Sequence, residues 1–223
     1  MFLDTANHEE IEAALALGLF EGVTTNPTIL LKEHRNRFDM ITSASQIGIP
    51  FLFVQVVGDR MEEMWEDYLL LLEQTDQSHS TSFGVKVPLN DEGIRFIHRV
   101  KQSDPDFPVL GTAVYTAEQA IIGSLAGCNY LSPYVNRMAS NSLNPYVEIK
   151  RMRQFIDNQG LDVQILAASF HESQEVVQAL EAGAHSVTIS YQIYQELINN
   201  KLANMDIKTF NEHAQRLPNE EHV

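Results

Sequence analysis

The stretch GVKVP at residues 84–88 places a lysine between two valines in a run that is otherwise apolar. It is one of eight runs of four to six residues, rich in Val, Ile, Leu and Phe, that alternate with segments of helical period. This alternation is typical of parallel strands joined by crossover helices, and runs without polar alternation indicate strands buried on both faces. The predicted strands are Met1–Thr5, Gly22–Thr25, Phe51–Val56, Gly84–Val87, Val109–Val114, Tyr130–Tyr134, Val163–Ala168 and Ser186–Ile189.

The segments between the runs carry the start and stop signals of helices. The first, HEEIEAALALG at residues 8–18, has acids in its first turn and ends on a glycine, where helices commonly stop. Eight strand–helix repeats in about 205 residues predict an α/β fold, a (β/α)8 TIM barrel forming a single domain over residues 1–223. Residues 206–217 are left over after closure and are predicted as an additional C-terminal helix, on the surface or reaching a neighbouring subunit. Further helices are predicted at Asp59–Gln74, Asn90–Lys101 and Thr116–Gly127, and from Pro145 onward.

The composition argues against several classes of function. The 223 residues carry a net charge of −15, which disfavours an extended nucleic-acid or anionic-membrane surface. A single cysteine, Cys128, cannot form an internal disulfide, and its apolar surroundings predict a buried thiol. No HExxH, GxGxxG or P-loop motif occurs, so neither a metal site nor a nucleotide cofactor is predicted. Without a signal peptide or a long apolar run, we expect a soluble cytoplasmic protein.

Polar side chains stand at or near the carboxyl ends of seven of the eight predicted strands. In barrel enzymes the reactive groups lie at this end of the strands. Any one of these residues alone is explained as a helix cap or a loop anchor, but their coincidence across seven strands favours a site. They are Asp4, Thr25 and Asn26, Gln55, Lys86, Thr112, Tyr134 and Ser169.

Lys86 is the most informative of these residues, because burying an ammonium group is energetically costly. Burial favours the neutral amine, which is the form that attacks a carbonyl carbon to give a Schiff base. The alternative is a structural lysine that reaches the barrel mouth or pairs with a carboxylate such as Asp4. Spacing alone leaves both interpretations open.

Three further residues have one functional and one structural interpretation each. Asp4 is either a proton-relay carboxylate beside the lysine or the N-cap of the helix that begins near His8. Arg137, just after the sixth strand, either binds a phosphate with its planar guanidinium or forms a surface ion pair. Ser169, after the seventh strand, either helps to bind that phosphate or caps the next helix.

Seven ordered motifs carry a resemblance that extends along nearly the whole chain. They are LDT at Leu3–Thr5, GVTTNPT at Gly22–Thr28, FVQV at Phe53–Val56, VKVP at Val85–Pro88, GTAVY at Gly111–Tyr115, SPYVNR at Ser132–Arg137 and AASF at Ala167–Phe170. The sequence resembles the transaldolase family, and within it the short bacterial fructose-6-phosphate aldolases. The resemblance implies a barrel, in agreement with the strand count, and a Schiff-base lysine at Lys86.

The resemblance also implies roles for the other candidates. Asp4 takes the position of the proton-relay carboxylate, and Asn26 that of the amide that binds the ketone donor. Arg137 and Ser169 match positions that hold the phosphate of the acceptor. The predicted catalytic residues are Asp4, Gln55, Lys86, Thr112 and Tyr134, of which Gln55, Thr112 and Tyr134 position a water molecule, and the predicted substrate-binding residues are Thr25, Asn26, Ser132, Arg137 and Ser169.

Two of these positions distinguish the subfamilies. Transaldolases have glutamate at the position of Gln55 and phenylalanine at that of Tyr134, so both markers indicate a fructose-6-phosphate aldolase. Ser132 departs from this pattern, since it stands where these aldolases have alanine and transaldolases have serine. A second departure is SYQIY at residues 190–194, where a turn containing proline is common.

The resemblance implies a cofactor-free class I aldolase that reversibly cleaves fructose 6-phosphate to dihydroxyacetone and glyceraldehyde 3-phosphate. One alternative is a transaldolase that passes the same three-carbon unit to another sugar phosphate. A second alternative is a non-catalytic barrel that binds sugar phosphates and in which Lys86 is a structural cation. The expected partners are small sugar phosphates and copies of the same chain, because the family forms pentamers and decamers through its C-terminal helix.

Overall fold

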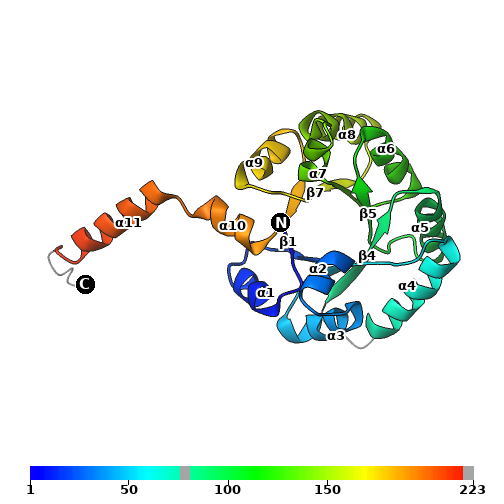
Figure 1. Cartoon of the computed structure of the whole chain (residues 1–223), viewed down its shortest axis with the longest axis horizontal. Coiled ribbons are helices and arrows are strands. Elements are labelled where there is room, and N and C mark those ends of the chain that lie inside the picture. The colour runs from blue at the N-terminus through cyan, green and yellow to red at the C-terminus, as the bar shows by residue number, and fades with distance from the viewer. Residues whose placement is uncertain (76–80, 218–223) are drawn as a thin grey trace.

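The computed structural model describes residues 1–75 and 81–217, and its eight strands close into one parallel barrel in sequence order (Figure 1). Each strand pairs in parallel with its neighbours in the chain, and β1 pairs with β8 to complete the ring. The predicted (β/α)8 TIM barrel is therefore confirmed. The strands are β1 Phe2–Asp4, β2 Gly22–Thr24, β3 Phe51–Gln55, β4 Ser82–Pro88, β5 Val109–Val114, β6 Tyr130–Pro133, β7 Gln164–Ala167 and β8 Ser186–Ile189.

Helices form the outer ring around the strands (Figure 1). The helices predicted after the third, fourth and fifth strands are present as α4, α5 and α6, and α8 begins at Pro145 as predicted. The sequence does not predict α2 and α7, since six residues are too few to show a helical period. The helices are α1 His8–Leu15, α2 Pro27–Lys32, α3 Arg37–Ile47, α4 Met61–Thr75, α5 Asp91–Ser103, α6 Ala117–Ala126, α7 Val135–Ser140, α8 Pro145–Gln159, α9 Ser173–Glu181, α10 Tyr191–Ile198 and α11 Lys201–Ala214.

Most helices begin directly after a residue whose side chain accepts a hydrogen bond from a backbone N–H of the first turn. The cap of α1 is Asn7 and not Asp4, and the residue at the cap position of α9 is Glu172 and not Ser169. The capping interpretation of Asp4 and of Ser169 is therefore wrong. The residues that cap with their side chains are Asn7, Asn26, Asn36, Asn90, Thr116, Asn144, Ser190 and Asn200.

The amino-terminal half of the barrel interior is filled by an aromatic and aliphatic cluster. Its buried members are Phe2, Phe53, Leu110 and Leu166, with Phe51 and Tyr130 packed against them. Gly84 makes room for this cluster, since a Cβ atom there would lie 2.6 Å from Cε1 of Phe53. Lys86, two residues further along β4, therefore points to the same side of the strand but one layer closer to the carboxyl end.

A larger apolar core lies between the strands and the helices that surround them. Cys128 belongs to this core and is 2% exposed, as predicted for a buried thiol. Burial raises the pKa of this thiol to about 12. A thiol so far from ionisation at neutral pH is a poor nucleophile.

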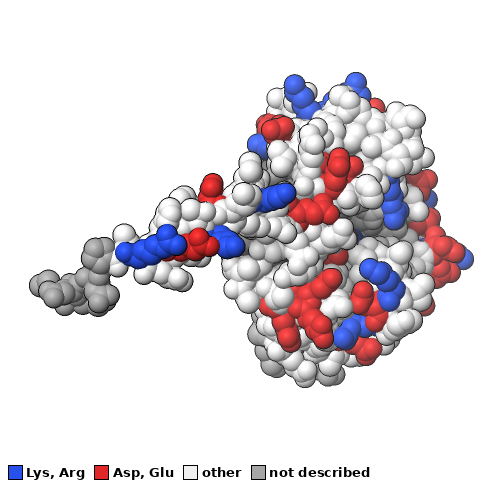
Figure 2. All heavy atoms as spheres, turned by 60° about the vertical axis from the view of Figure 1, so that its left-hand side comes forward, with Lys and Arg blue, Asp and Glu red and all other residues white. Residues whose placement is uncertain are grey.

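The last helix, α11, extends away from the barrel, and all of its residues are exposed (Figure 1). It begins at Lys201, earlier than the predicted residue 206, and ends at Ala214. Among the described residues on the face in Figure 2, Lys and Arg side chains are scattered and do not merge into a continuous basic surface. Within the described ranges, every helix is too short or too polar to cross a membrane.

Candidate active site

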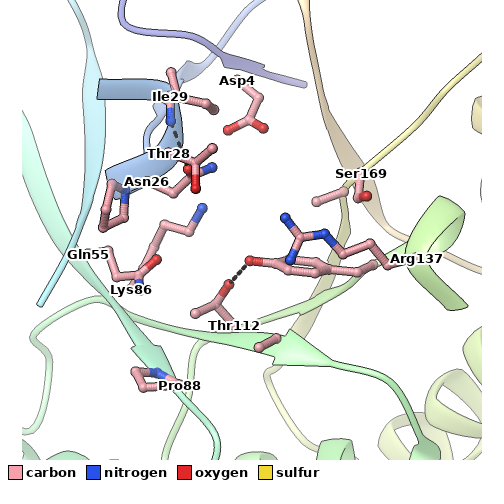
Figure 3. Close-up of a pocket in the computed structure, with 14 residues that line it drawn as sticks. Asp4, Asn26, Thr28, Ile29, Gln55, Lys86, Pro88, Thr112, Arg137 and Ser169 are labelled. Atoms are coloured by element: carbon pink, nitrogen blue, oxygen red, sulfur yellow. Dashed lines mark hydrogen bonds between the residues drawn. The ribbon is translucent and has the colours of Figure 1, made fainter. Parts of the chain in front are cut away.

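A pocket of about 450 Å³ opens at the carboxyl end of the strands (Figure 3). Eight of the ten predicted site residues line it, and they come from the ends of β1, β3, β4 and β5 and from the segments after β2, β6 and β7. These eight are Asp4, Asn26, Gln55, Lys86, Thr112, Tyr134, Arg137 and Ser169. The pocket also includes Pro27, Thr28, Ile29, Pro88, Ala113 and Ala168, which the sequence does not single out.

Lys86 reaches this pocket from near the carboxyl end of β4, with its backbone in register with Gln55 of β3. The residue is 2% exposed, and its amine points into the cavity toward Asn26 and Asp4 (Figure 3). Among residues 1–75 and 81–217, no hydrogen bond or ion pair occupies the amine. The geometry therefore leaves a buried amine available to a ligand in the pocket.

Asp4 lies at the end of β1, beside the lysine. Thr24 donates a hydrogen bond of 2.7 Å to its Oδ1 atom, and the hydroxyl of Thr24 is 2.6 Å from that of Thr188. Burial raises the pKa of the Asp4 carboxyl above its usual 3.8, although the nearby Lys86 ammonium and the Thr24 hydrogen bond act in the opposite direction. A carboxyl that keeps its proton to a higher pH and faces an amine can exchange protons with groups bound there.

Two predicted substrate-binding residues lie outside the pocket lining. Thr25 is fully buried, and its hydroxyl donates to the backbone carbonyl of Phe53 at 3.4 Å. The preceding residue, Thr24, does not line the pocket either, but its hydroxyl contacts Asp4. Ser132 is 1% exposed, and its hydroxyl has no hydrogen-bond partner among the described residues. It lies on β6 below the rim of the pocket that Tyr134 helps to form.

Thr112 and Tyr134 meet across β5 and β6, with 2.7 Å between their hydroxyl oxygens (Figure 3). The pairing of these strands shifts by one residue between Gly111 and Val114, which marks a β-bulge. Ala113 has a left-handed backbone, with φ of 57°, and lines the pocket directly after Thr112. The bulge therefore presents two consecutive residues to the same cavity, which a regular strand cannot do.

Gln55 ends β3 on the other side of Lys86, and its side chain lines the pocket. Its backbone carbonyl accepts a hydrogen bond of 3.2 Å from Nη1 of Arg37. Arg37 also forms a largely buried ion pair with Asp67 of α4, and Asp67 accepts from the backbone N–H of Val57 at 2.9 Å. This ion pair holds the chain on both sides of Val56 and so fixes the end of β3 that carries Gln55.

Arg137 and Ser169 lie together on the opposite side of the pocket from Gln55 and Lys86 (Figure 3). The backbone N–H of Asn136 donates to the carbonyl of Ser169 at 2.7 Å, which joins α7 to the segment after β7. The Arg137 guanidinium stands 5.0 Å from the centre of the Tyr134 ring, and in the described part of the chain it pairs with no acid. The predicted surface ion pair is therefore not formed, and a cation remains at the mouth.

Asn26 combines a structural and a site position. Its side-chain oxygen accepts from the backbone N–H of Ile29 at 3.0 Å and so caps α2. This leaves its NH₂ group available to the pocket. Thr28 and Ile29 enter the lining because α2 begins at the pocket edge, where Asn26 and the proline after it are the sequence signals for the start of that short helix.

Within residues 1–75 and 81–217, no cluster of three or more His, Cys, Asp or Glu side chains is placed to hold a metal ion. The charged and polar groups that face the pocket are instead one amine, one carboxyl, one guanidinium, two amides and several hydroxyls. Such a set suits a small polar molecule that carries a carbonyl at one end and an anionic group at the other.

Comparison with known proteins identifies a family that matches nearly the whole chain. Residues 1–222 match the family model described as transaldolase/fructose-6-phosphate aldolase. A probable transaldolase 2 from Listeria monocytogenes is 31% identical over 209 residues, which cover 94% of this chain and 93% of the relative. A probable transaldolase from Thermoanaerobacter sp. is 30% identical over 211 residues, covering 95% and 94%. The chain therefore belongs to the transaldolase/fructose-6-phosphate aldolase family.

Proposed function

We propose that the protein is a class I aldolase that reversibly cleaves fructose 6-phosphate to dihydroxyacetone and glyceraldehyde 3-phosphate. The observation that carries the proposal is the Lys86 amine, which is buried, unpaired among the described residues and directed into the pocket beside Asp4. The amine attacks the ketose carbonyl, water leaves, and a protonated imine forms. Asp4 relays the protons that this addition and dehydration require.

The hydroxyl on C4 of the ketose gives up its proton to the bound water as the bond between C3 and C4 breaks, and the protonated imine at C2 takes up the electron pair of that bond. Glyceraldehyde 3-phosphate leaves, and the three-carbon fragment remains on Lys86 as an enamine. Protonation of the enamine carbon and hydrolysis of the resulting imine release dihydroxyacetone and restore the amine. We assign the water used here to Gln55, Thr112 and Tyr134, and the hydroxyl contact of 2.7 Å between the last two supports this assignment.

The two ends of the substrate are assigned to opposite sides of the pocket. Arg137, stacked near Tyr134 and unpaired among the described residues, supplies the charge and the planar donors that a phosphate needs, with Ser169 beside it. Asn26 binds the donor end through its free NH₂ group. Ser132 is assigned to the same end, because its buried hydroxyl lacks a partner in the described structure.

The alternative within the family is a transaldolase, and two observations favour it. The relatives from Listeria and Thermoanaerobacter are named probable transaldolases, and Ser132 matches the transaldolase pattern. Gln55 and Tyr134 favour the aldolase, because an amide and a phenol offer the shared water a different set of protons than a carboxylate and a phenyl ring. The two reactions differ only in the fate of the enamine. In the aldolase it is protonated and hydrolysed, and in the transaldolase it is transferred to an aldose.

One assay separates the two activities. The purified protein is incubated with fructose 6-phosphate alone and then with added erythrose 4-phosphate, and glyceraldehyde 3-phosphate is followed through a coupled dehydrogenase. The aldolase releases it without an acceptor. Release that depends on the acceptor would establish the transaldolase instead.

A second experiment tests the covalent intermediate that both activities share. The protein is treated with dihydroxyacetone and borohydride, and the adduct is located by intact mass and peptide mapping. We expect one reduced adduct on Lys86. If no adduct forms there, the chain is a barrel that binds sugar phosphates without turnover.

We further propose that the protein is a homo-oligomer, a pentamer or a decamer, in which α11 packs on a neighbouring copy. The helix carries Leu202, Met205, Ile207 and Phe210 at exposures of 55–71%, which an isolated chain leaves in contact with water. Light scattering coupled to size-exclusion chromatography measures the mass. A monomeric mass would contradict this proposal.

A further inference from the structure

A pair of buried threonines stands behind Asp4, outside the lining of the pocket. Thr24 and Thr188 belong to β2 and β8, the two strands that flank β1 in the closed barrel. Their exposures are 0% and 2%, and their hydroxyl oxygens are 2.6 Å apart although 164 positions separate them in the chain. Only Thr24 touches the carboxyl, at 2.7 Å.

The proton count of this group fixes the direction of its hydrogen bonds. A threonine hydroxyl has one hydrogen to donate and lone pairs to accept. When the Asp4 carboxyl is ionised, it can only accept, so Thr24 must donate its single hydroxyl hydrogen to Oδ1. The hydrogen between the two threonines must then come from Thr188, so the chain runs from Thr188 through Thr24 to Asp4.

A protonated Asp4 allows the reverse arrangement. The carboxyl can then donate to Thr24, which turns its hydrogen toward Thr188. The hydroxyl pair therefore has a hydrogen-bonded arrangement for each protonation state of the carboxyl, as a residue that alternately takes and gives a proton requires. Valine has the same shape as threonine and equal strand preference, so packing alone does not call for a hydroxyl at residue 188.

We propose that Thr188 is a positioning residue for the reaction, acting on Asp4 through Thr24. Its hydroxyl holds the Thr24 hydroxyl as a donor toward the carboxylate and accepts from it when the carboxyl carries the proton. This inference rests on the proposed function, in which Asp4 relays protons between solvent and the Lys86 adduct.

Other charged and titratable groups lie near the same carboxyl, and a variant that tests Thr188 must leave them unchanged. Lys86 on β4 is the charged group that acts directly on Asp4. Arg137 and Tyr134 line the pocket, and Glu10 of α1 accepts a hydrogen bond from the hydroxyl of Thr5, next to Asp4 in the chain. A substitution at Thr188 leaves all four in place.

The test compares Thr188→Val, which removes the hydroxyl at constant shape, with Thr188→Ser, which keeps it. We expect Thr188→Val to lower kcat about fivefold to tenfold with KM changed by less than about twofold, because one buried donor is lost and no substrate contact changes. The acidic limb of the kcat profile should move to higher pH, since the carboxylate loses part of its hydrogen-bond support. Thr188→Ser should restore both properties.

The matched control is Ser124→Ala, which removes another buried hydroxyl, one that donates to the Ala120 carbonyl within α6. It should leave kcat and the pH profile unchanged. If Thr188→Val folds poorly by circular dichroism, Thr188→Ala makes the same deletion with less bulk. A wild-type pH profile in the hydroxyl-free variant, or a serine variant as impaired as the valine, would overturn the inference.

Borohydride trapping keeps this inference separate from the proposed function. A missing adduct on wild-type Lys86 means that the proposed function fails. An adduct formed by the wild type, together with an unaltered Thr188→Val enzyme, means that the role of Thr188 fails alone.

Discussion

The two layers inside the barrel are built from the same strands and differ in almost every property. Phe2, Phe53 and Leu110 fill the amino-terminal layer, and two residues later the same strands place Asp4, Gln55 and Thr112 in the pocket. The first layer is closely packed, with the Phe53 ring centre 4.6 Å from that of Phe51 and 5.3 Å from that of Tyr130. The second encloses a cavity, buries an amine and partly buries a carboxyl.

The comparison shows that one layer of the barrel interior stabilises the fold, whereas the other carries the groups that react. Aromatic packing stabilises the barrel without exposing polar groups, so the amino-terminal layer can be optimised for burial alone. The carboxyl-terminal layer keeps polar groups partly unpaired, which costs stability but leaves them free to react. Substitutions in the two layers should therefore affect stability and activity in opposite proportion.

The largest effect is expected at Lys86. Lys86→Met should lower kcat at least about ten-thousandfold, because no other lysine among the described residues lines the pocket, while the free energy of unfolding stays the same or rises. Steady-state kinetics and urea denaturation measure the two quantities.

The contrasting lysine is Lys101, whose amine donates to the carbonyls of Pro105 and Phe107 and to Asn129 at 2.7–3.0 Å. Lys101→Met should cost about 1–3 kcal/mol of stability and leave kcat unchanged. Residual turnover by Lys86→Met at the wild-type rate would contradict the assignment of the nucleophile.

A large stability effect is expected at Phe53, in the amino-terminal layer. Phe53→Ala should lower the free energy of unfolding by about 3–5 kcal/mol, through lost burial and the cavity that remains. Gln55→Ala, two residues along the same strand, should change stability by less than about 1 kcal/mol and reduce turnover. Similar stability losses at both positions would show that the two layers are not separated in the way we describe.

A smaller, pH-dependent effect is expected at Asp4. Because its folded-state pKa lies above 3.8, the folded protein keeps this proton over a pH window in which the unfolded chain has released it. At higher pH the carboxyl ionises in the folded state too, where desolvation makes the charged form unfavourable. The wild-type protein is therefore less stable at that pH. Asp4→Asn should thus gain stability relative to the wild type as pH rises from about 3.8 through the folded-state pKa. Urea denaturation along a pH series checks this, and a difference that is constant with pH would count against it.

The smallest effect is expected at Ala113, whose left-handed backbone forms the bulge in β5. Ala113→Gly should raise the free energy of unfolding by at most about 1 kcal/mol, because glycine adopts this conformation without strain. Ala167→Gly is the control, since that residue is buried in β7 and has no positive φ, and it should destabilise the protein. Equal destabilisation by both substitutions would mean that the bulge stores no strain.

Most of the site could be predicted, because it depends on which residues end the strands. In a barrel every strand end meets the same mouth, so the sequence predicts that Lys86, Gln55 and Thr112 lie together. The sequence does not reveal that Thr24 contacts Asp4 while Thr25 contacts the backbone of Phe53. Strands buried on both faces show no polar alternation, so the run that contains β2 does not indicate which of the two threonines points toward the inside of the barrel.

The sequence alone determined the eight strands, the longer helices that separate them, and an amine buried in the fourth strand. These are local properties, because strand, cap and helix signals lie within a few residues of the elements that they specify. Only the tertiary structure decided that Thr188 supports Thr24, that a bulge turns Thr112 and Ala113 into one cavity, and that α11 lies free of the barrel. The first two depend on closing β8 onto β1 or on the exact register of neighbouring strands, which couples residues far apart in the chain, and the third depends on which contacts the last helix makes.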